Sequence, residues 1–322
     1  MDLIQAKSER ALLAANQQLR GALGRCMQEM TDQLIDLLAR VEAYIDFPDE
    51  DLPSEDRTNL LAGVQQLALA TARLLATNHY GTILRDGLKT VILGEPNSGK
   101  SSLLNRLVGH ERALVSAEAG TTRDYLEERI TLGPYCIRLT DTAGLNPHPS
   151  SLEKLGMAKT LERTAEADLI MLVLDATRPM PPLPGEVQAR LTPQSSLVVI
   201  NKIDLVSIDP LPEVPISLPI MKTSALTGAG CDELVSAIVQ RAESFRVEQG
   251  EDLVTINSRH AYALNQASAC LLEAQSKLAT TGPLELLASD LRGVLAAFGE
   301  ISGKIDNEQV LDRLFSTFCI GK

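Results

Sequence analysis

The sequence has no excess of positive charge. Its 322 residues hold 30 Lys and Arg against 42 Asp and Glu, which gives a formal net charge of −12 at pH 7. A strong basic field that would hold a nucleic acid by counterion release is therefore excluded. If RNA is the substrate, we expect another component to hold most of it.

Cysteine pairs and long apolar runs are also missing. The five cysteines show no C-x-x-C spacing, and no cluster of histidines accompanies them, so neither a disulfide framework nor a zinc site is indicated. The first residues lack a basic region followed by an apolar one, and no run approaches the roughly 18 apolar residues of a membrane-spanning helix. We therefore expect a cytoplasmic protein in a reducing compartment, with no membrane partner.

The spacing of apolar residues changes twice along the chain. It is helical over residues 1–86, where we expect three helices, and helical again over 248–322. Between them, residues 87–247 alternate short apolar runs, such as 90–93 and 169–174, with helical patterns. Near-continuous apolar strands separated by helices indicate a mostly parallel sheet with helices on both faces. We therefore predict an α/β domain inserted into an all-α helical domain.

The strongest motif is Gly94-Glu-Pro-Asn-Ser-Gly-Lys-Ser101, which lies between an apolar run and a helical pattern. In this G-x-x-x-x-G-K-S loop, backbone N–H groups and a helix N-terminus surround phosphates. Lys100 is expected to reach the β- and γ-phosphates, and the Ser101 hydroxyl to bind Mg²⁺. For this pattern taken alone, a chance glycine turn is the alternative. Its placement favours a P-loop domain.

Asp141-Thr-Ala-Gly144 ends a second apolar run. An acidic residue at the C-terminal end of a strand beside the phosphate loop can hold the Mg²⁺ shell, while the Gly144 N–H can sense the γ-phosphate. An acidic residue in a surface turn is the alternative. The two motifs together fit one nucleotide site.

Asn201-Lys202-Ile-Asp204 follows another apolar run and predicts the base. The Asp204 carboxylate can accept from guanine N1–H and the exocyclic amine, groups that adenine does not present. Ser224-Ala225 follows in the order expected for a last loop that contacts the same base edge, although this short motif is nonspecific. Guanine is therefore the expected base.

Hydrolysis needs groups that the motifs above do not supply. Gly120-Thr-Thr-Arg-Asp124 is placed where a switch segment would be ordered by γ-phosphate, with Thr122 as the Mg²⁺ ligand. The position where Ras-like GTPases have a water-orienting glutamine is Leu145. No arginine finger is identifiable, and such a finger contributes roughly 10³–10⁵ in rate. Another residue and another cation must take these roles.

Several segments together resemble the MnmE (TrmE) family of tRNA-modifying GTPases, and the resemblance spans the chain. They are the P-loop with its asparagine, Gly120-Thr-Thr-Arg-Asp124, Ile45-Asp-Phe-Pro-Asp-Glu50 and the terminal Phe318-Cys-Ile-Gly-Lys322. The terminal motif is the most specific, because generic translational GTPases do not end in this way.

The resemblance implies a potassium ion in place of the arginine finger, which also favours dimerisation of two G domains. It implies that Glu153 orients the nucleophile through water; a helix N-terminal acid is the alternative reading of this residue. The implied potassium ligands are Asn97, Ser116, Glu118 and Thr121. The implied nucleotide contacts also include Ser98, Gly99, Ser102, Thr121 and Lys202.

The resemblance further implies a role in modifying the wobble uridine, U34, of tRNA at C5 together with the FAD-containing partner MnmG. Cys319 is then essential for modification but not for GTP hydrolysis, and Lys322 lies near a folate cofactor. Position alone would make Cys319 a free thiol on a frayed tail.

The sequence departs from the family in two places. Members carry an N-terminal domain that binds a tetrahydrofolate one-carbon donor and forms a constitutive dimer, whereas this chain starts where that domain should end. Met1 is compatible with an internal start, a cloning boundary or the true beginning of a shortened protein.

The second departure lies in the segments around the nucleotide. Asn146-Pro-His-Pro-Ser-Ser151 replaces the usual acidic and basic residues after D-T-A-G, and Ala117-Glu118 replaces a more usual Asp-Ile. Slower hydrolysis is expected from the stiffened segment before Glu153.

Two other functions stay open at this point. The G-domain motifs alone also fit a switch GTPase in ribosome assembly or signalling, which would give Cys319 no task. A nucleotide-binding scaffold without useful turnover is the non-enzymatic alternative.

Overall fold

A computed structural model of the 322-residue chain describes residues 6–46, 54–110, 127–141, 160–206, 217–246, 254–280 and 282–303. The chain divides into two compact units. One unit comprises the described residues up to Leu12 together with Ile83–Phe245, and the other comprises Leu13–Thr82 together with the described residues from Arg246 onwards. We call them the sheet unit and the helical unit.

The expected domain boundaries stay predictions, because a compact unit is defined by contacts and not by function. The compact units do not coincide with the expected boundaries. The sheet unit also includes residues 83–86 and ends at Phe245, and it includes the first turn of α2 (Glu9–Leu19). Its Arg10 N–H donates to Pro134 O (3.2 Å), and its guanidinium pairs with Glu243 (3.1 Å).

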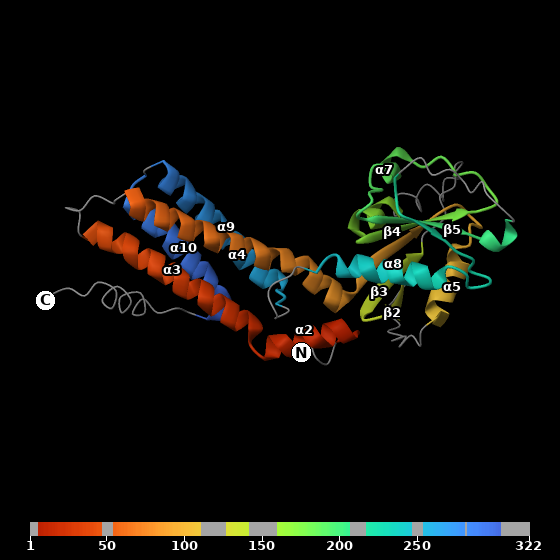
Figure 1. The fold of residues 1–322 in the computed structure, drawn as a ribbon, viewed down its shortest axis with the longest axis horizontal. Helices are drawn as coiled ribbons and strands as arrows, with labels where there is room; N and C mark the ends of the chain where they lie inside the picture. Colours follow the sequence, from red (N-terminus) through yellow and green to blue (C-terminus); the bar gives the residue numbers. More distant parts are fainter. Residues whose placement is uncertain are drawn as a thin grey trace. The chain divides into compact units, whose positions relative to one another are not determined.

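Long helices form the helical unit and share one apolar core. They are α3 (Ala22–Asp46), α4 (Ser54–Asp86, of which residues up to Thr82 belong to this unit), α9 (Ser258–Ala279) and α10 (Leu284–Ser302). On α3 the buried residues recur at helical spacing, as in Met27, Leu34, Leu38 and Val41, which gives the helix one apolar face. Figure 1 shows these helices lying lengthwise beside one another.

Sequence-local signals set where helices of this unit begin. The Asn257 side chain accepts a hydrogen bond from His260 N (2.9 Å), which caps the first turn of α9. Pro283 immediately precedes α10, where its missing N–H costs nothing because early helical N–H groups have no partner in the helix.

One of these helices has the length and composition of a membrane span. An 18-residue window within Asp56–Asp86 is apolar enough to cross a membrane, and 33% of that window is buried. The sequence analysis expected no such segment, so the structure differs from it on this point. A single helix of this kind is weak evidence for a membrane, because core helices pass the same test; here Leu60, Leu67 and Leu74 lie in the apolar core.

The described residues of the sheet unit form a sheet with strand order β2-β3-β1-β4-β5-β6. Within this described sheet, β2 runs antiparallel to its neighbour β3, and the other neighbours are parallel. The strands are β1 (Leu88–Leu93), β2 (Glu127–Leu132), β3 (Tyr135–Asp141), β4 (Leu169–Asp175), β5 (Ser196–Asn201) and β6 (Ile220–Lys222). The predicted fold class, a mostly parallel sheet with an added helical domain, is confirmed.

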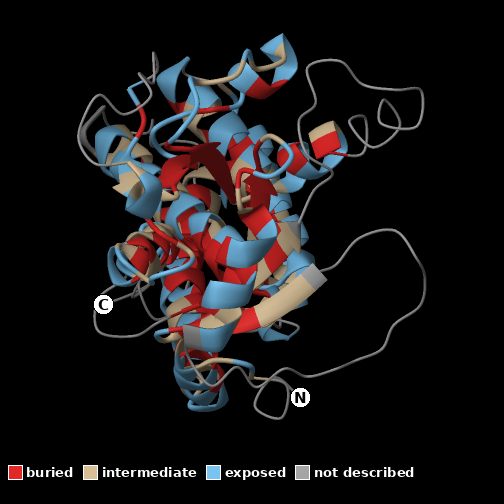
Figure 2. Cartoon of the chain, turned by 90° about the vertical axis from the view of Figure 1, so that its right-hand side faces the viewer, coloured by how far each residue is buried: buried red, intermediate tan, exposed pale blue. Residues whose placement is uncertain are grey.

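The central strands of the sheet are buried on both faces, because helices cover the sheet on either side. Every residue of β4 and β5 is buried, as expected for parallel strands between two layers. One face packs on Val187 of α7 (Gly185–Gln188) and on Leu161, within the helical residues 160–166. In Figure 2 the buried interior is red and the exposed outer surfaces of the helices are pale blue.

Two more helices of this unit pack against the sheet. The helix α5 (Lys100–His110) contacts β3, and α8 (Cys231–Glu243) contacts β2. Each buries apolar residues at helical spacing: Leu103 and Leu107 of α5, and Leu234 and Ile238 of α8. Since β1, β4 and β5 run parallel, their carboxyl ends meet at one edge of the sheet, from which α5 starts.

Candidate nucleotide-binding site

The loop between β1 and α5 can be formed only with glycine at two positions. Gly94 has φ +154°, and a Cβ there would lie 2.3 Å from Val173 O. Gly99 has φ +93°, and a Cβ there would lie 2.2 Å from Asn201 Nδ2. Between them, Asn97 adopts a left-handed conformation with φ +64°. A backbone folded this tightly directs successive N–H groups into one concavity, which is the geometry that binds phosphate.

The side chains of this loop lie where a phosphate chain would need them. Lys100 is 8% exposed, and its Nζ donates to the carbonyl oxygens of Gly94 (3.0 Å) and Glu95 (2.8 Å). The Ser98 hydroxyl is buried and has no hydrogen-bond partner among the described residues. A buried hydroxyl in this position is costly unless a ligand satisfies it.

The first turn of α5 carries the next two predicted residues. Ser101 and Ser102 are exposed there, directly after Lys100. A helix N-terminus has unpaired N–H groups and a positive dipole end, so anions are stabilised beside it.

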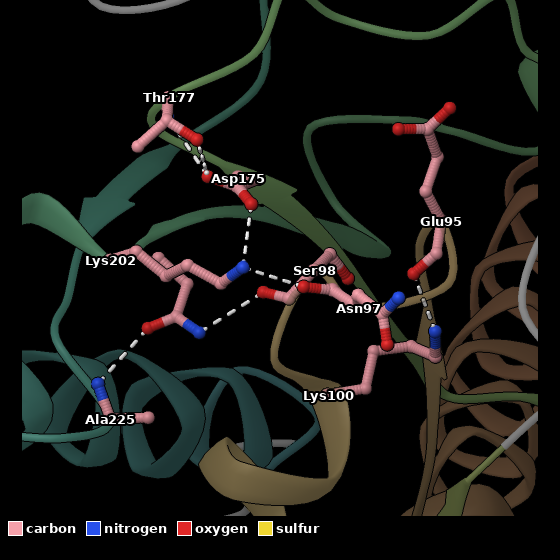
Figure 3. A network of polar contacts seen from close by, with 9 residues as sticks. Glu95, Asn97, Ser98, Lys100, Asp175, Thr177, Lys202 and Ala225 are labelled. Atoms are coloured by element: carbon pink, nitrogen blue, oxygen red, sulfur yellow. Dashed lines mark hydrogen bonds and ion pairs between the residues drawn. The ribbon is translucent and has the colours of Figure 1, made fainter. Parts of the chain in front are cut away.

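The end of β5 is tied to the phosphate loop by Asn201. This residue is 1% exposed; its Nδ2 donates to Ser98 O (3.1 Å), and its Oδ1 accepts from Ala225 N (3.0 Å) (Figure 3). The nitrogen and the oxygen of the amide thus both form hydrogen bonds with the protein backbone. The sequence placed Asn201 in the base-recognising motif; in the structure its side chain joins three loops to one another.

Lys202 makes the second tie. Its Nζ lies 2.6 Å from Asn97 O and 2.6 Å from Asp175 Oδ2 (Figure 3). Asp175 also accepts, through Oδ1, from the N–H (2.9 Å) and the hydroxyl (2.6 Å) of Thr177. Burial acts to raise the pKa of Asp175, but the hydrogen bonds from Lys202 and Thr177 outweigh it and hold that pKa below its usual value.

The residues expected to read the base lie on the two following loops. Asp204 is exposed within the short helix η1 (Ile203–Leu205). Ser224 is buried, and its Oγ accepts from Thr227 N (3.1 Å). The two loops are joined where Ile203 N donates to Thr223 O (3.2 Å). Asp204 and Ala225 therefore come from adjacent loops at the edge where the phosphate loop also lies.

Comparison with known sequences decides which family this arrangement belongs to. The profile of the family described as MnmE helical domain matches residues 1–319. The tRNA modification GTPase MnmE of Opitutus terrae is 53% identical over 323 residues, which cover 100% of this chain and 72% of the relative. The chain belongs to the MnmE family. The MnmE of Akkermansia muciniphila is 40% identical, covering 100% of this chain and 70% of the relative.

Among solved structures, the G domain of the T. maritima FeoB iron transporter is 28% identical, covering 48% of this chain and 98% of that chain, with a TM-score of 0.36. A TM-score of this size carries no argument about the MnmE-family chain. The family resemblance predicted from the sequence is confirmed by the profile and the relatives.

Some predicted site residues of this MnmE-family chain lie outside the described residues. Asp141 ends β3 and is paired in register with Ile92 of β1, so its backbone lies at the edge that carries the phosphate loop. The predicted residues outside the described ranges are Ser116, Glu118, Thr121, Thr122, Gly144, Glu153, Cys319 and Lys322. Their roles stay predictions.

Sequence reasoning missed Asp175 and Thr177. The run 169–174 was recognised as a strand, and the Asp-Ala-Thr that follows it was available as a signal. An acidic residue at the carboxyl end of a buried parallel strand is placed where ligands of such sheets bind.

Proposed function

We propose that this chain binds GTP at the carboxyl edge of its sheet, hydrolyses it with K⁺ and Mg²⁺, and acts with MnmG in modifying U34 of tRNA at C5. The observation that carries the proposal is the joining of the three motif loops through Asn201, which contacts Ser98 and Ala225. Membership of the MnmE family supports the coupling to tRNA modification.

The described residues fit a guanine nucleotide. The unpartnered Ser98 hydroxyl, the concave backbone at Asn97 and the start of α5 offer donors to phosphate oxygens. The exposed Asp204 carboxylate supplies the two acceptors that guanine needs, and no donor to satisfy an adenine acceptor. The Ala225 N–H is held in place by Asn201.

The ions are those that the family resemblance implies. Ser101, with Thr122 and Asp141, would hold Mg²⁺, while Asn97, Ser116, Glu118 and Thr121 would hold K⁺. Bound there, the two ions neutralise charge that develops on the phosphates. Among the described residues no group of three or more His, Cys, Asp and Glu could hold a metal ion. A Mg²⁺ held by two hydroxyls, one carboxylate and nucleotide oxygens needs no such group.

Protein groups then complete the hydrolytic machinery. Lys100, released from its carbonyl partners, would donate to the β- and γ-phosphates, and the Gly144 N–H would follow the γ-phosphate. Glu153 would orient the attacking water, because Leu145 cannot accept or donate a hydrogen bond.

Modification would depend on the C-terminal motif, with tRNA held mainly by MnmG because this chain is acidic. Cys319 would take part in modification but not in hydrolysis, and Lys322 would lie near the folate donor bound by a separate or preceding domain. Burial raises the pKa of the other cysteines, so they are not activated thiolates; they are Cys26, Cys136, Cys231 and Cys270. We place this activity in the cytoplasm, with two G domains pairing in the GTP- and K⁺-bound state.

The test is the steady-state GTPase rate in KCl and in NaCl at equal ionic strength, together with binding of fluorescently labelled GDP. We expect binding in both salts and faster turnover in KCl. Equal rates would remove the potassium mechanism, and absence of GDP binding would remove the whole proposal. Turnover without uridine modification in the presence of MnmG would favour a switch GTPase of another kind.

A further inference from the structure

Asp175 is not a member of the predicted nucleotide motifs, but it contacts two of their residues: its backbone is paired in register with Asn201, and its carboxylate pairs with Lys202. Among the described residues, two other than glycine have positive φ: Asn97 (64°) and Lys202 (66°). A left-handed conformation is strained for a residue with a Cβ and persists only when surrounding contacts impose it. The Lys202 ammonium joins these two residues to each other through its bond to Asn97 O.

The contact between the Lys202 ammonium and the Asn97 carbonyl needs a negative charge close to the ammonium. The Asp175 side chain is 6% exposed and that of Lys202 29%, so water can do little to stabilise the ammonium on its Asp175 side. The carboxylate, itself held by Thr177, supplies a charge-assisted hydrogen bond of 2.6 Å. Without that charge, the ammonium is free to leave Asn97 and both left-handed turns lose a constraint.

We infer that Asp175 is a positioning residue for nucleotide binding: it holds Lys202 against the Asn97 carbonyl and thereby keeps the phosphate loop and the base-reading loop in their binding conformations. The inference rests on the proposed function, since it concerns the same site. Asp175 acts through Lys202 and is not assigned a contact with nucleotide.

A comparison of two carboxylates in one unit provides the test. Asp175→Asn removes the charge under Lys202, whereas Glu243→Gln breaks the Arg10 ion pair on α8, away from the phosphate loop. We expect the Kd for labelled GDP to rise about tenfold or more in D175N and to stay within about twofold in E243Q. Unchanged GDP affinity in D175N, or an equal loss in E243Q, would overturn the inference.

A double-variant cycle shows whether Asp175 acts through Lys202. With Lys202→Met in place, the further change Asp175→Asn is expected to leave GDP affinity where K202M alone puts it, because the coupled contact is already gone. Independent, additive losses would overturn the positioning role. If D175N instead damaged the structure in general, it would lower GDP affinity by the same factor with Lys202 present and with K202M in place.

A milder variant covers the case in which D175N does not fold. Thr177→Val removes one of the hydrogen bonds to the carboxylate and keeps its charge. We expect a loss of GDP affinity of about threefold that disappears in the K202M background; an unchanged affinity would overturn the inference. Failure of the proposed function is distinct, because the unaltered chain would then not bind labelled GDP at all.

Discussion

The two units of this chain bury polar side chains of different kinds. Among the described residues of the helical unit, the buried polar side chains are threonines, such as Thr31 and Thr71. In the sheet unit, by contrast, Lys100, Asp175 and Asn201 are buried, and all three lie at the carboxyl edge of the sheet. Burying charge and amide groups is costly unless every one is paired.

This contrast separates a scaffold from a site. The helical unit is organised by an apolar core, and some of its ion pairs, such as Arg292 with Glu42 (2.8 Å), keep one partner exposed. Such pairs contribute little, about 0–1 kcal/mol. In the sheet unit the buried charges meet strained backbone at one edge, which is where we place the nucleotide. Four changes would break or sharpen this division.

The largest effect is expected for Lys100→Ala. The buried ammonium is the positive charge on the loop that surrounds the phosphates, so its loss is expected to lower kcat/KM for GTP by at least about 10³-fold. Steady-state phosphate release measures this change. Lys89→Ala, at the opposite end of β1, is the matched control and should retain activity. Similar losses in both variants would contradict a special role for the carboxyl edge.

Asp204→Asn is expected to weaken GTP binding by about 10²-fold, because the charge is lost and one acceptor is replaced by an amide donor that faces a guanine donor. It should also shift the preference toward xanthine nucleotide, since the amide can donate where the carboxylate could only accept. Competition between labelled GDP and xanthosine diphosphate measures the shift. Asp232→Asn, in the first turn of α8, is the control. Unchanged guanine selectivity would show that the base is read elsewhere.

Leu264→Ala tests the helical unit. Leu264 is fully buried in the apolar core, and truncation is expected to lower the free energy of unfolding of that unit by at least about 2 kcal/mol. Urea denaturation followed by circular dichroism measures this loss, and Leu272→Ala, whose side chain is exposed on the same helix, should be nearly neutral. GDP affinity should stay within about twofold in both. A nucleotide-binding defect in L264A would break the separation of scaffold and site.

The smallest effect concerns acid. The folded chain holds the pKa of Asp175 below its unfolded value of about 3.9, so the stabilisation is fully present above that pH. It is lost as the pH falls through the lower, folded pKa. The melting temperature of the unaltered chain should therefore exceed that of D175N by a constant amount from pH 7 to about pH 5, and the difference should shrink below about pH 4. A difference that widens on acidification would mean that the carboxyl is protonated more easily in the folded state.

Most of the architecture could be predicted because it depends on local patterns. The buried run 169–174, the turn glycines Gly94 and Gly99, and the helical stripe of α3 each report their own element, since a strand or helix buries residues at a fixed spacing. The family followed from short motifs in the same way, and both the fold class and the family are confirmed. The α2 first turn was different: its place in the sheet unit comes from Pro134 and Glu243, far away in sequence.

By itself, the sequence determined the change from helical to strand-and-helix patterns, where the phosphate loop starts, and that Lys100 and Asp204 are candidates for one nucleotide. Only the tertiary structure decided how the loops hold one another. Asn201 and Ser98 are 103 residues apart, Lys202 and Asn97 are 105 apart, and Lys202 and Asp175 are 27 apart. Periodicity reports neighbours within a few residues, whereas these contacts exist because parallel strands bring their carboxyl ends to one edge, and that order of strands is set by packing of the whole sheet.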